Sequence, residues 1–371
     1  MKVYWRDRSD AFFLLYPFAF LAISLIGVWV RPPGRGLDHE LKFFTDVLFF
    51  NSVHAALTFW ALLLLPAARP WRVAKQERPT WLGFWPKATL LMVALAAFFA
   101  VKLGYLQVPR EIFRPFDVAF AFIARVIPTQ HTIWQVLGLS ILFHQIQKRE
   151  RGLTEPTAEI LAHDRREKSY FLAFLILALI PPLAGRSIEI WQIHDLQSTR
   201  GPLGWIVSGL LLTLTAILVR HQLSGPLGGD PRRALYVARL AVWALVPISP
   251  WAFYAAAAVH GIEYVFVMWR LIPVEQRVWS RWLVPGLAIF AVGGALIRYA
   301  SHLGDTYTTE QIPIWMAAAQ VIVLTIQWIH YHFDRELFLM RDPATRAFTG
   351  RQLNLWFEPQ RDSDHPPIRS T

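Results

Sequence analysis

Long apolar segments recur along this chain and constrain its fold more than any other feature of the sequence. A backbone surrounded by lipid has to satisfy its own hydrogen bonds, and only helices and closed barrels do so. Most of the apolar runs approach the ~20 residues that a helix needs to cross the hydrocarbon core, and alternating strand patterns are missing. Hydrophobic residues make up 54% of the chain and charged residues 17%, whereas soluble domains carry about 25% charged residues. The sequence therefore predicts an all-α integral membrane protein.

We expect about ten transmembrane helices in one helical domain over residues 1–342, followed by a polar cytoplasmic tail, 343–371. The predicted spans cover residues 11–30, 43–66, 84–106, 117–147, 169–186, 203–220, 235–248, 250–271, 282–300 and 313–336. Segment 117–147 is too long for one straight crossing and contains Pro128, so a bend is expected there. The Pro-Ile-Ser-Pro sequence at 247–250 is expected to separate two spans, because proline cannot continue a helix.

Basic residues gather in the N-terminal flank, in alternate loops and in the tail, and the net charge is +11. With ten spans, these basic segments all fall on one side, which places both termini in the cytoplasm and suits a bacterial inner membrane. This distribution favours the lipid bilayer, and not nucleic acid, as the partner of the basic residues. The first apolar run lacks a small-residue cleavage motif, so it is expected to remain as a span. Cys is absent, so a metal site would use His, carboxylate, backbone or solvent ligands.

Four of the predicted spans carry a histidine together with a carboxylate or an amide. The pairs are Asn51 with His54, His131 with Gln135, His260 with Glu263, and His330 with Asp334. The members of each pair lie three or four positions apart, so they share one face of a helix. Ionisable groups inside a membrane are costly and mark functional sites. We therefore expect the four helices to bring these side chains to one shared site.

Imidazole and carboxylate together form the ligand set of non-haem iron, and helix bundles build such sites from facing helices. The predicted ligands of one or two iron ions are His54, His131, His260, His330 and Asp334. Asp334 and Glu263 are the candidate catalytic carboxylates. The groups expected to hydrogen-bond the ligands and orient the rings are Asn51, Gln135, Gln327 and Tyr264. Whether Glu263, His144 and His332 belong to the site stays open at this point.

Other polar residues of the spans favour structural interpretations. His144 and His332 lie close to basic loops, and His332 points about 200° away from His330 on an ideal helix. His163 lies in a loop on this prediction and is expected to be solvated. Arg239 lies near a span end and is expected to extend toward the lipid headgroups.

Three motifs near the C-terminus carry a resemblance. They are H-x-x-E-Y at His260–Tyr264, H-Y-x-x-D at His330–Asp334 and R-D-P-x-x-R at Arg341–Arg346. This pattern resembles a set of uncharacterised bacterial polytopic membrane proteins, in which Gln stands at the position of Glu263. The use of histidines from several membrane helices also resembles the Brp/Blh-type membrane carotene oxygenases. The second resemblance implies iron held by histidines and oxidation of a lipophilic molecule.

The function predicted from these features is that of a membrane-embedded non-haem iron oxidoreductase, similar to an oxygenase or a desaturase. Its substrate would be a lipophilic small molecule that enters from the bilayer, and an electron-donor protein is a candidate partner. One alternative is a haem b electron-transfer protein that uses paired histidines such as His54 and His131. Another is a proton-coupled transporter that uses the same His and Asp groups as a relay.

Overall fold

A computed structural model describes residues 8–29, 54–55, 84–152, 157–184, 202–271 and 314–337, together with Thr345. These residues form helices and turns, with no strand among them, so the predicted all-α class is confirmed for this part of the chain. The helices are α1 (Arg8–Trp29), α5 (Phe84–Lys102), α6 (Arg110–Glu150), α7 (Ala158–Ala184), α9 (Pro202–Leu223), α10 (Pro231–Ala238), α11 (Leu240–Ala244), α12 (Pro250–Leu271) and α14 (Ile314–Leu337).

Within the described residues, three helical segments are long and apolar enough to cross a membrane: Ala11–Trp29, Pro202–Leu223 and Trp251–Met268. The first two expose large apolar side chains, among them Ile26 and Ile206, which are 61% and 59% exposed. Such exposure is costly in water and suits lipid. These helices indicate a membrane-embedded protein. The predicted spans 43–66 and 282–300 lie outside the described residues, except for His54 and Ala55, which are helical.

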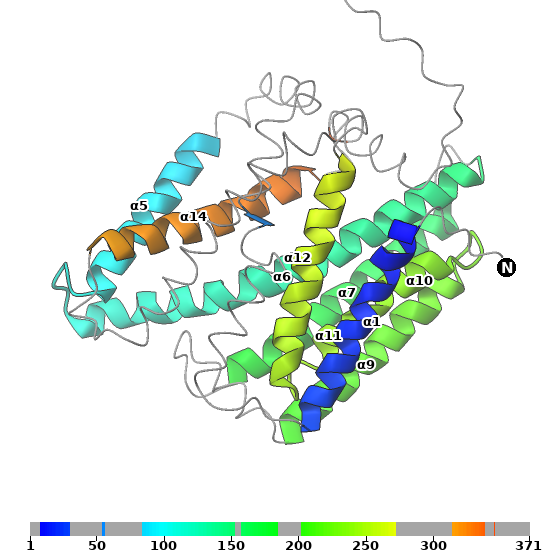
Figure 1. The fold of residues 1–371 in the computed structure, drawn as a ribbon, viewed down its shortest axis with the longest axis horizontal. Coiled ribbons are helices and arrows are strands. Elements are labelled where there is room, and N and C mark those ends of the chain that lie inside the picture. Colours follow the sequence, from blue (N-terminus) through cyan, green and yellow to red (C-terminus); the bar gives the residue numbers. More distant parts are fainter. Residues whose placement is uncertain are drawn as a thin grey trace, which may run out of the picture.

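The longest helix, α6, connects the two sides of the molecule. In Figure 1, α5 and α14 lie together on the left, α1, α7, α9, α10 and α11 lie on the right, and α6 extends through both groups behind α12. Its 41 residues span about 60 Å at 1.5 Å per residue. The helix continues through Pro128, and the Thr132 hydroxyl donates to the Pro128 carbonyl at 3.0 Å. The side chains of α6 can therefore contribute to sites in both halves.

The predicted span 235–248 is wrong, because α10 and α11 divide this segment. They contain 8 and 5 residues, whereas a crossing helix needs about 20. Asp230 caps α10 by accepting from the Arg232 backbone N–H at 3.0 Å. The break falls at Arg239, whose Nε donates to the Tyr236 carbonyl at 2.9 Å. After α11 the chain turns, and α12 begins at Pro250, as predicted from the two prolines.

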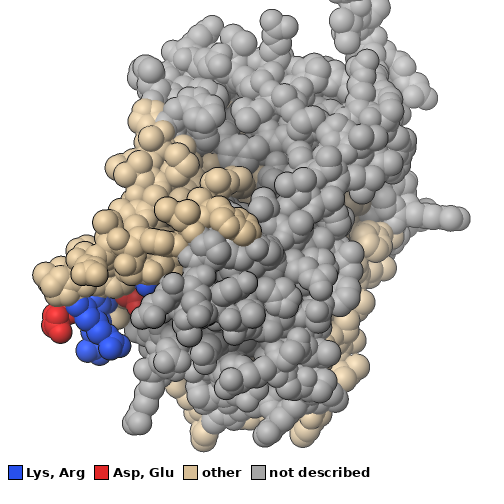
Figure 2. Space-filling view, turned by 60° about the vertical axis from the view of Figure 1, so that its left-hand side comes forward, with Lys and Arg blue, Asp and Glu red and all other residues tan. Residues whose placement is uncertain are grey.

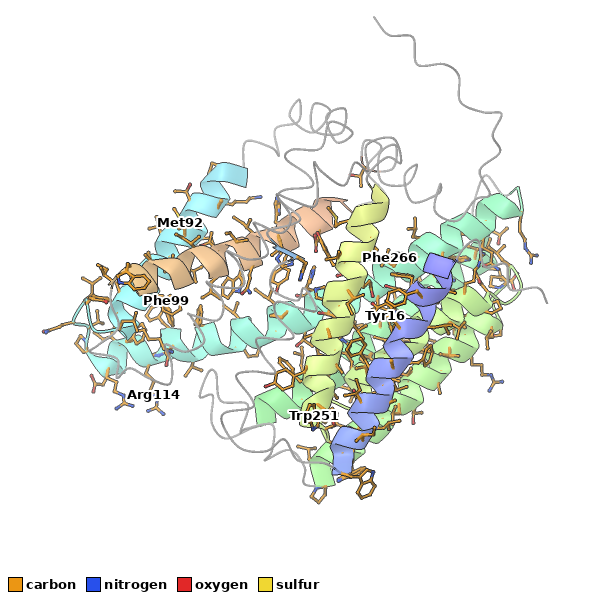
Figure 3. The ribbon with its side chains drawn as sticks, viewed as in Figure 1. Tyr16, Met92, Phe99, Arg114, Trp251 and Phe266 are labelled. Carbon is orange, nitrogen blue, oxygen red and sulfur yellow. The ribbon has the colours of Figure 1, made fainter. Side chains whose placement is uncertain are left out.

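Helices α1 and α12 pack closely along their length. The Tyr16 hydroxyl donates to the Val259 carbonyl at 2.7 Å. Near the other end, a Cβ on Gly27 would lie 2.3–2.6 Å from side-chain atoms of Trp251, so only glycine fits there. Figure 3 shows Tyr16 and Phe266 near one end of this pair and Trp251 near the other. The contact holds α12, and with it His260, in a fixed position.

Near α5, charged and uncharged residues occupy separate parts of the surface. Figure 2 shows its described charged atoms gathered at one end, with an uncharged surface beside them. Lys102, at the end of α5, lies 2.8 Å from the Asp117 carboxylate on α6, and Figure 3 shows Arg114 at the same end of α6. Leu90 on α5 is 70% exposed. A charged edge beside an apolar face is the pattern expected at the boundary between headgroups and hydrocarbon.

Candidate metal centre

Four histidines and one aspartate from four helical segments converge in the interior. We call this set the central cluster: His54, His131 on α6, His260 on α12, and His330 and Asp334 on α14. Two overlapping triads of side chains could each hold a metal ion, and His131 belongs to both. In Figure 3, nitrogen-bearing side chains gather where α14 approaches α12 and α6. The structure thus brings together all five residues that the sequence singled out as ligands.

Two of three short distances within the central cluster are close to those between ligands of one ion. His54 Nε2 and His330 Nε2 lie 3.1 Å apart, and His131 Nε2 lies 3.2 Å from Asp334 Oδ2. His330 Nε2 and Asp334 Oδ2 are 4.0 Å apart. Metal–nitrogen bonds of about 2.0–2.1 Å place neighbouring ligand atoms about 3.0 Å apart in an octahedron and about 3.3 Å apart in a tetrahedron. The ligand atoms therefore need little movement to surround an ion.

Some polar atoms of the central cluster lack hydrogen bonds that their burial demands. His131 Nε2 and Asp334 Oδ2 are buried and, among the described residues, neither has a partner in hydrogen-bond geometry. Asp334 as a whole is 5% exposed. The two atoms lie 3.2 Å apart as an ion pair, but without good hydrogen-bond geometry each is only partly satisfied, and incomplete satisfaction of buried polar atoms is costly. A bound cation would satisfy both atoms.

Two tyrosines hold the ligands in place. Tyr264, four residues after His260 on α12, donates its hydroxyl to Asp334 Oδ1, and its ring lies on His54 with centroids 4.6 Å apart. Tyr331 lies on His131 with centroids 4.3 Å apart. The hydrogen bond leaves Asp334 Oδ2 turned toward His131. Tyr264 is therefore placed to orient the carboxylate, as the sequence predicted for a neighbour of the ligands.

Glu263 lies in a different network from the central cluster. It is 2% exposed and forms an ion pair with Arg239. It also accepts a hydrogen bond from the Tyr236 hydroxyl at 2.6 Å and one from Gln135 Nε2 at 3.3 Å. The prediction that Arg239 reaches the headgroups is wrong, because its guanidinium is buried against Glu263 and over the Tyr236 ring, 3.7 Å from the centroid. The carboxylate of Glu263, a candidate catalytic group from the sequence, is therefore already bound by Arg239, Tyr236 and Gln135.

The remaining predicted neighbours have mixed positions. Gln135 donates to Glu263, one turn along α6 from His131, so it braces the helices next to the cluster. Gln327 is half-buried one turn before His330, and its role stays a prediction. Asn51 lies outside the described residues. His332 is half-buried on α14 and belongs to neither triad of the central cluster.

A second polar cluster lies at the far end of α6 and was not anticipated. We call His144, His163 and Asp164 the end cluster; its ligand-type atoms also lie within 4.8 Å of one another. The prediction that His163 is solvated is wrong, since it is 7% exposed. The reason is that α7 begins at Ala158, well before its apolar run, and carries His163 into the bundle. The Thr157 hydroxyl, which accepts from the Ile160 N–H at 3.3 Å, is the local signal for this early start.

A buried ion pair lies beside the end cluster. Arg233 on α10 pairs with Glu167 on α7, and its Nε donates to the Ser140 hydroxyl at 2.9 Å. Gln222 Nε2 also donates to Glu167, at 3.0 Å. Burial lowers the pKa of the Arg233 guanidinium, while the Glu167 carboxylate acts to raise it, and arginine stays protonated in proteins. The pair is therefore charged and satisfied, and it ties together α6, α7, α9 and α10.

Comparison of the chain with protein-family models, with curated proteins and with solved structures gives no match. The candidate metal centre therefore rests on the geometry of the chain's own residues. The resemblance carried by the His260–Tyr264 and His330–Asp334 motifs stays a sequence-based expectation.

Proposed function

We propose that this protein is a membrane-embedded oxidoreductase whose central cluster binds non-haem iron and oxidises a lipophilic small molecule. The observation that carries the proposal is the convergence of four imidazoles and one carboxylate, from four helical segments, in two overlapping triads in the interior. Histidine with carboxylate is the ligand set used by non-haem iron enzymes. An iron ion held there would supply redox chemistry with dioxygen that protein side chains alone cannot perform.

The packing of the rings favours an ion over haem. A porphyrin has to lie between its two axial ligands. In the central cluster, His54 and His131 each have the rings of His260 and His330 as neighbours, with centroids 4.7–5.2 Å apart. Asp334 lies among these rings. Such close packing suits a single small ion or a pair of ions, and leaves little room for a macrocycle between the imidazoles.

The protein's own residues would have three tasks in such a reaction. The imidazoles and Asp334 would bind the ion, and Tyr264 would hold the carboxylate in a fixed orientation. Next to the cluster, the Gln135–Glu263 hydrogen bond would hold α12 against α6, and the Arg239–Glu263 pair would hold α12 against the segment between α10 and α11. The burial of His54, His260 and His330 would keep bulk water away from the reacting atoms.

The substrate class follows from the surroundings of the site. The helices that carry the cluster have apolar outer faces, such as Phe116 on α6 and Ile322 on α14, which are 63% and 50% exposed. A molecule dissolved in the bilayer could therefore approach between helices without crossing water. We propose a lipid-like substrate, a protein electron donor at the membrane surface, and a bacterial inner membrane with both termini in the cytoplasm.

Metal analysis tests this proposal. The full chain, purified in detergent and loaded with ferrous iron, is compared with His330→Ala, Asp334→Ala and the control His332→Ala, and iron per chain and the absorption spectrum are measured for each. We expect one or two iron ions per chain without a Soret band, lost in the first two variants and kept in the control. A Soret band would move the assignment to a haem protein. Failure of wild type to bind iron would contradict the proposal and favour a proton-coupled transporter.

A further inference from the structure

The end cluster lies on the same helix as part of the central cluster, but in a different region of the bundle. His144 follows His131 by thirteen residues on α6, which is about 20 Å along the helix axis. His163 and Asp164 come from the first turns of α7, beside the end of α9 and the start of α10, on the right in Figure 1. No step of the proposed oxidation uses these residues.

The hydrogen bonds of His163 fix which of its nitrogens carries the proton. Its Nε2 lies 3.1 Å from the His221 backbone carbonyl, which can only accept, so Nε2 must donate. In a neutral imidazole the lone pair then lies on Nδ1. Nδ1 is buried without a hydrogen-bond partner among the described residues, and the whole side chain is 8% exposed. Histidines that bind metals commonly donate one ring nitrogen to a backbone carbonyl, which orients the ring, and bind the metal through the lone pair of the other nitrogen.

The lone pair of His163 faces a carboxylate. Its Nδ1 lies 3.9 Å from Asp164 Oδ1, which is too far for a hydrogen bond. His144 Nδ1 forms an ion pair with the same oxygen at 2.6 Å, so a metal ion bound there would take the place of the proton between these two atoms. Separations of 2.6 and 3.9 Å bracket the ~3.3 Å between ligand atoms of a tetrahedral ion. His163 Nδ1 and Asp164 Oδ1 are acceptors that face one another, and a cation between them would satisfy both.

We propose that the end cluster is a second metal site, which binds a divalent first-row transition ion through His144, His163 and Asp164. Two imidazoles and a carboxylate suit Zn²⁺, Fe²⁺ or Co²⁺, and three protein ligands leave at least one position for solvent or another ligand. The site does not depend on the central cluster or on the proposed oxidation, because it shares no residue with it.

One neighbouring cation acts against binding and provides a diagnostic variant. Lys148 Nζ lies 3.4 Å from Asp164 Oδ2, the oxygen that does not face the imidazoles. Arg233 is nearby as well, but Glu167 neutralises it. A metal ion on Oδ1 would leave Oδ2 to Lys148, with repulsion between the ion and the ammonium. Lys148→Met should therefore bind metal more tightly, on the order of tenfold, whereas a cluster that serves only as an ion-pair network would bind none.

The experiment uses the full chain in detergent with the central cluster disabled by His260→Ala and His330→Ala. This protein is stripped with a chelator, and Zn²⁺ binding is measured by titration calorimetry, by zinc per chain after gel filtration and by the shift of the melting temperature. In the same background, His163→Phe keeps a ring against His221 but removes Nδ1, and Asp164→Asn removes the charge. His221→Phe is the matched control, because it keeps the stacked ring and the backbone carbonyl that His163 contacts.

We expect one Zn²⁺ per chain in the background protein and in His221→Phe, at least a hundredfold weaker binding in His163→Phe and in Asp164→Asn, and tighter binding in Lys148→Met. The melting temperature should rise with zinc only in the proteins that bind it, which separates loss of ligands from loss of fold. The absence of zinc from the background protein and from Lys148→Met, or its full retention in both ligand variants, would overturn the proposal. Neither result would bear on iron in the central cluster.

Discussion

The Glu263–Arg239 pair allows a sharp test of which carboxylate binds metal and which supports the fold. Glu263 is 2% exposed and accepts from Arg239, Tyr236 and Gln135. Glu263→Gln keeps the shape of the side chain but leaves the Arg239 guanidinium buried without a counter-charge. Removing one partner of a buried ion pair costs about 3–5 kcal/mol. With a shift of roughly 2–4 °C per kcal/mol, the melting temperature should fall by about 6–20 °C.

The assay combines thermal unfolding in detergent, followed by circular dichroism, with iron per folded chain. Glu263→Gln should melt earlier and keep the iron content of wild type, because Glu263 belongs to neither triad of the central cluster. The double variant Arg239→Met, Glu263→Gln should recover most of the lost stability, since no buried charge is left unpaired. Loss of iron at an unchanged melting temperature would refute the reasoning and make Glu263 a ligand. A double variant less stable than either single variant would refute the ion pair.

Three further predictions concern packing, ligand orientation and metal removal. Gly27→Ala should lower the free energy of unfolding by about 1–3 kcal/mol, measured by thermal unfolding, because the added Cβ would overlap Trp251. Adding Trp251→Leu to the same chain should relieve the overlap, and equal stability of wild type and Gly27→Ala would contradict the close contact. Tyr264→Phe keeps the ring but removes the hydrogen bond to Asp334, so iron affinity should fall about 10–100-fold in a competition titration. Tyr331→Phe is the control, and unchanged affinity in Tyr264→Phe would show that the bond does not orient the ligand. Chelation of iron should lower the melting temperature of wild type but not of Asp334→Ala, by an amount equivalent to about 4 kcal/mol when free iron had been a thousandfold above Kd; an equal effect on both proteins would contradict a stabilising ion in the central cluster.

The sequence could predict the central cluster because helical periodicity determines which side chains share a face. Residues three or four positions apart, such as His330 and Asp334, have to point the same way once the segment is helical. The apolar runs gave good boundaries for α1, α9 and α12, since length and hydrophobicity decide where a crossing helix lies. Burial then explains why the polar faces turn toward one another.

The errors arose where tertiary contacts decide the outcome. Arg239 has a long charged side chain of the kind that extends to headgroups, but the packing of α11 against α12 brings it to Glu263 instead. Segment 235–248 is hydrophobic enough for a short span, yet the helix breaks at Arg239, whose side chain donates to the Tyr236 carbonyl. Hydropathy predicts a solvated His163 because it does not reveal a polar helix turn that packs inside a bundle.

X-ray absorption at the iron K-edge of the iron-loaded full chain would show directly whether the four histidines hold iron, because it reports the atoms bound to the metal. The account predicts nitrogen and oxygen neighbours at about 2.0–2.2 Å, as for comparable His and carboxylate ligands, with the outer-shell scattering of several imidazoles and no porphyrin signature. Iron surrounded only by oxygen, without imidazole scattering, would show that the metal is not held by the four histidines and would contradict the account.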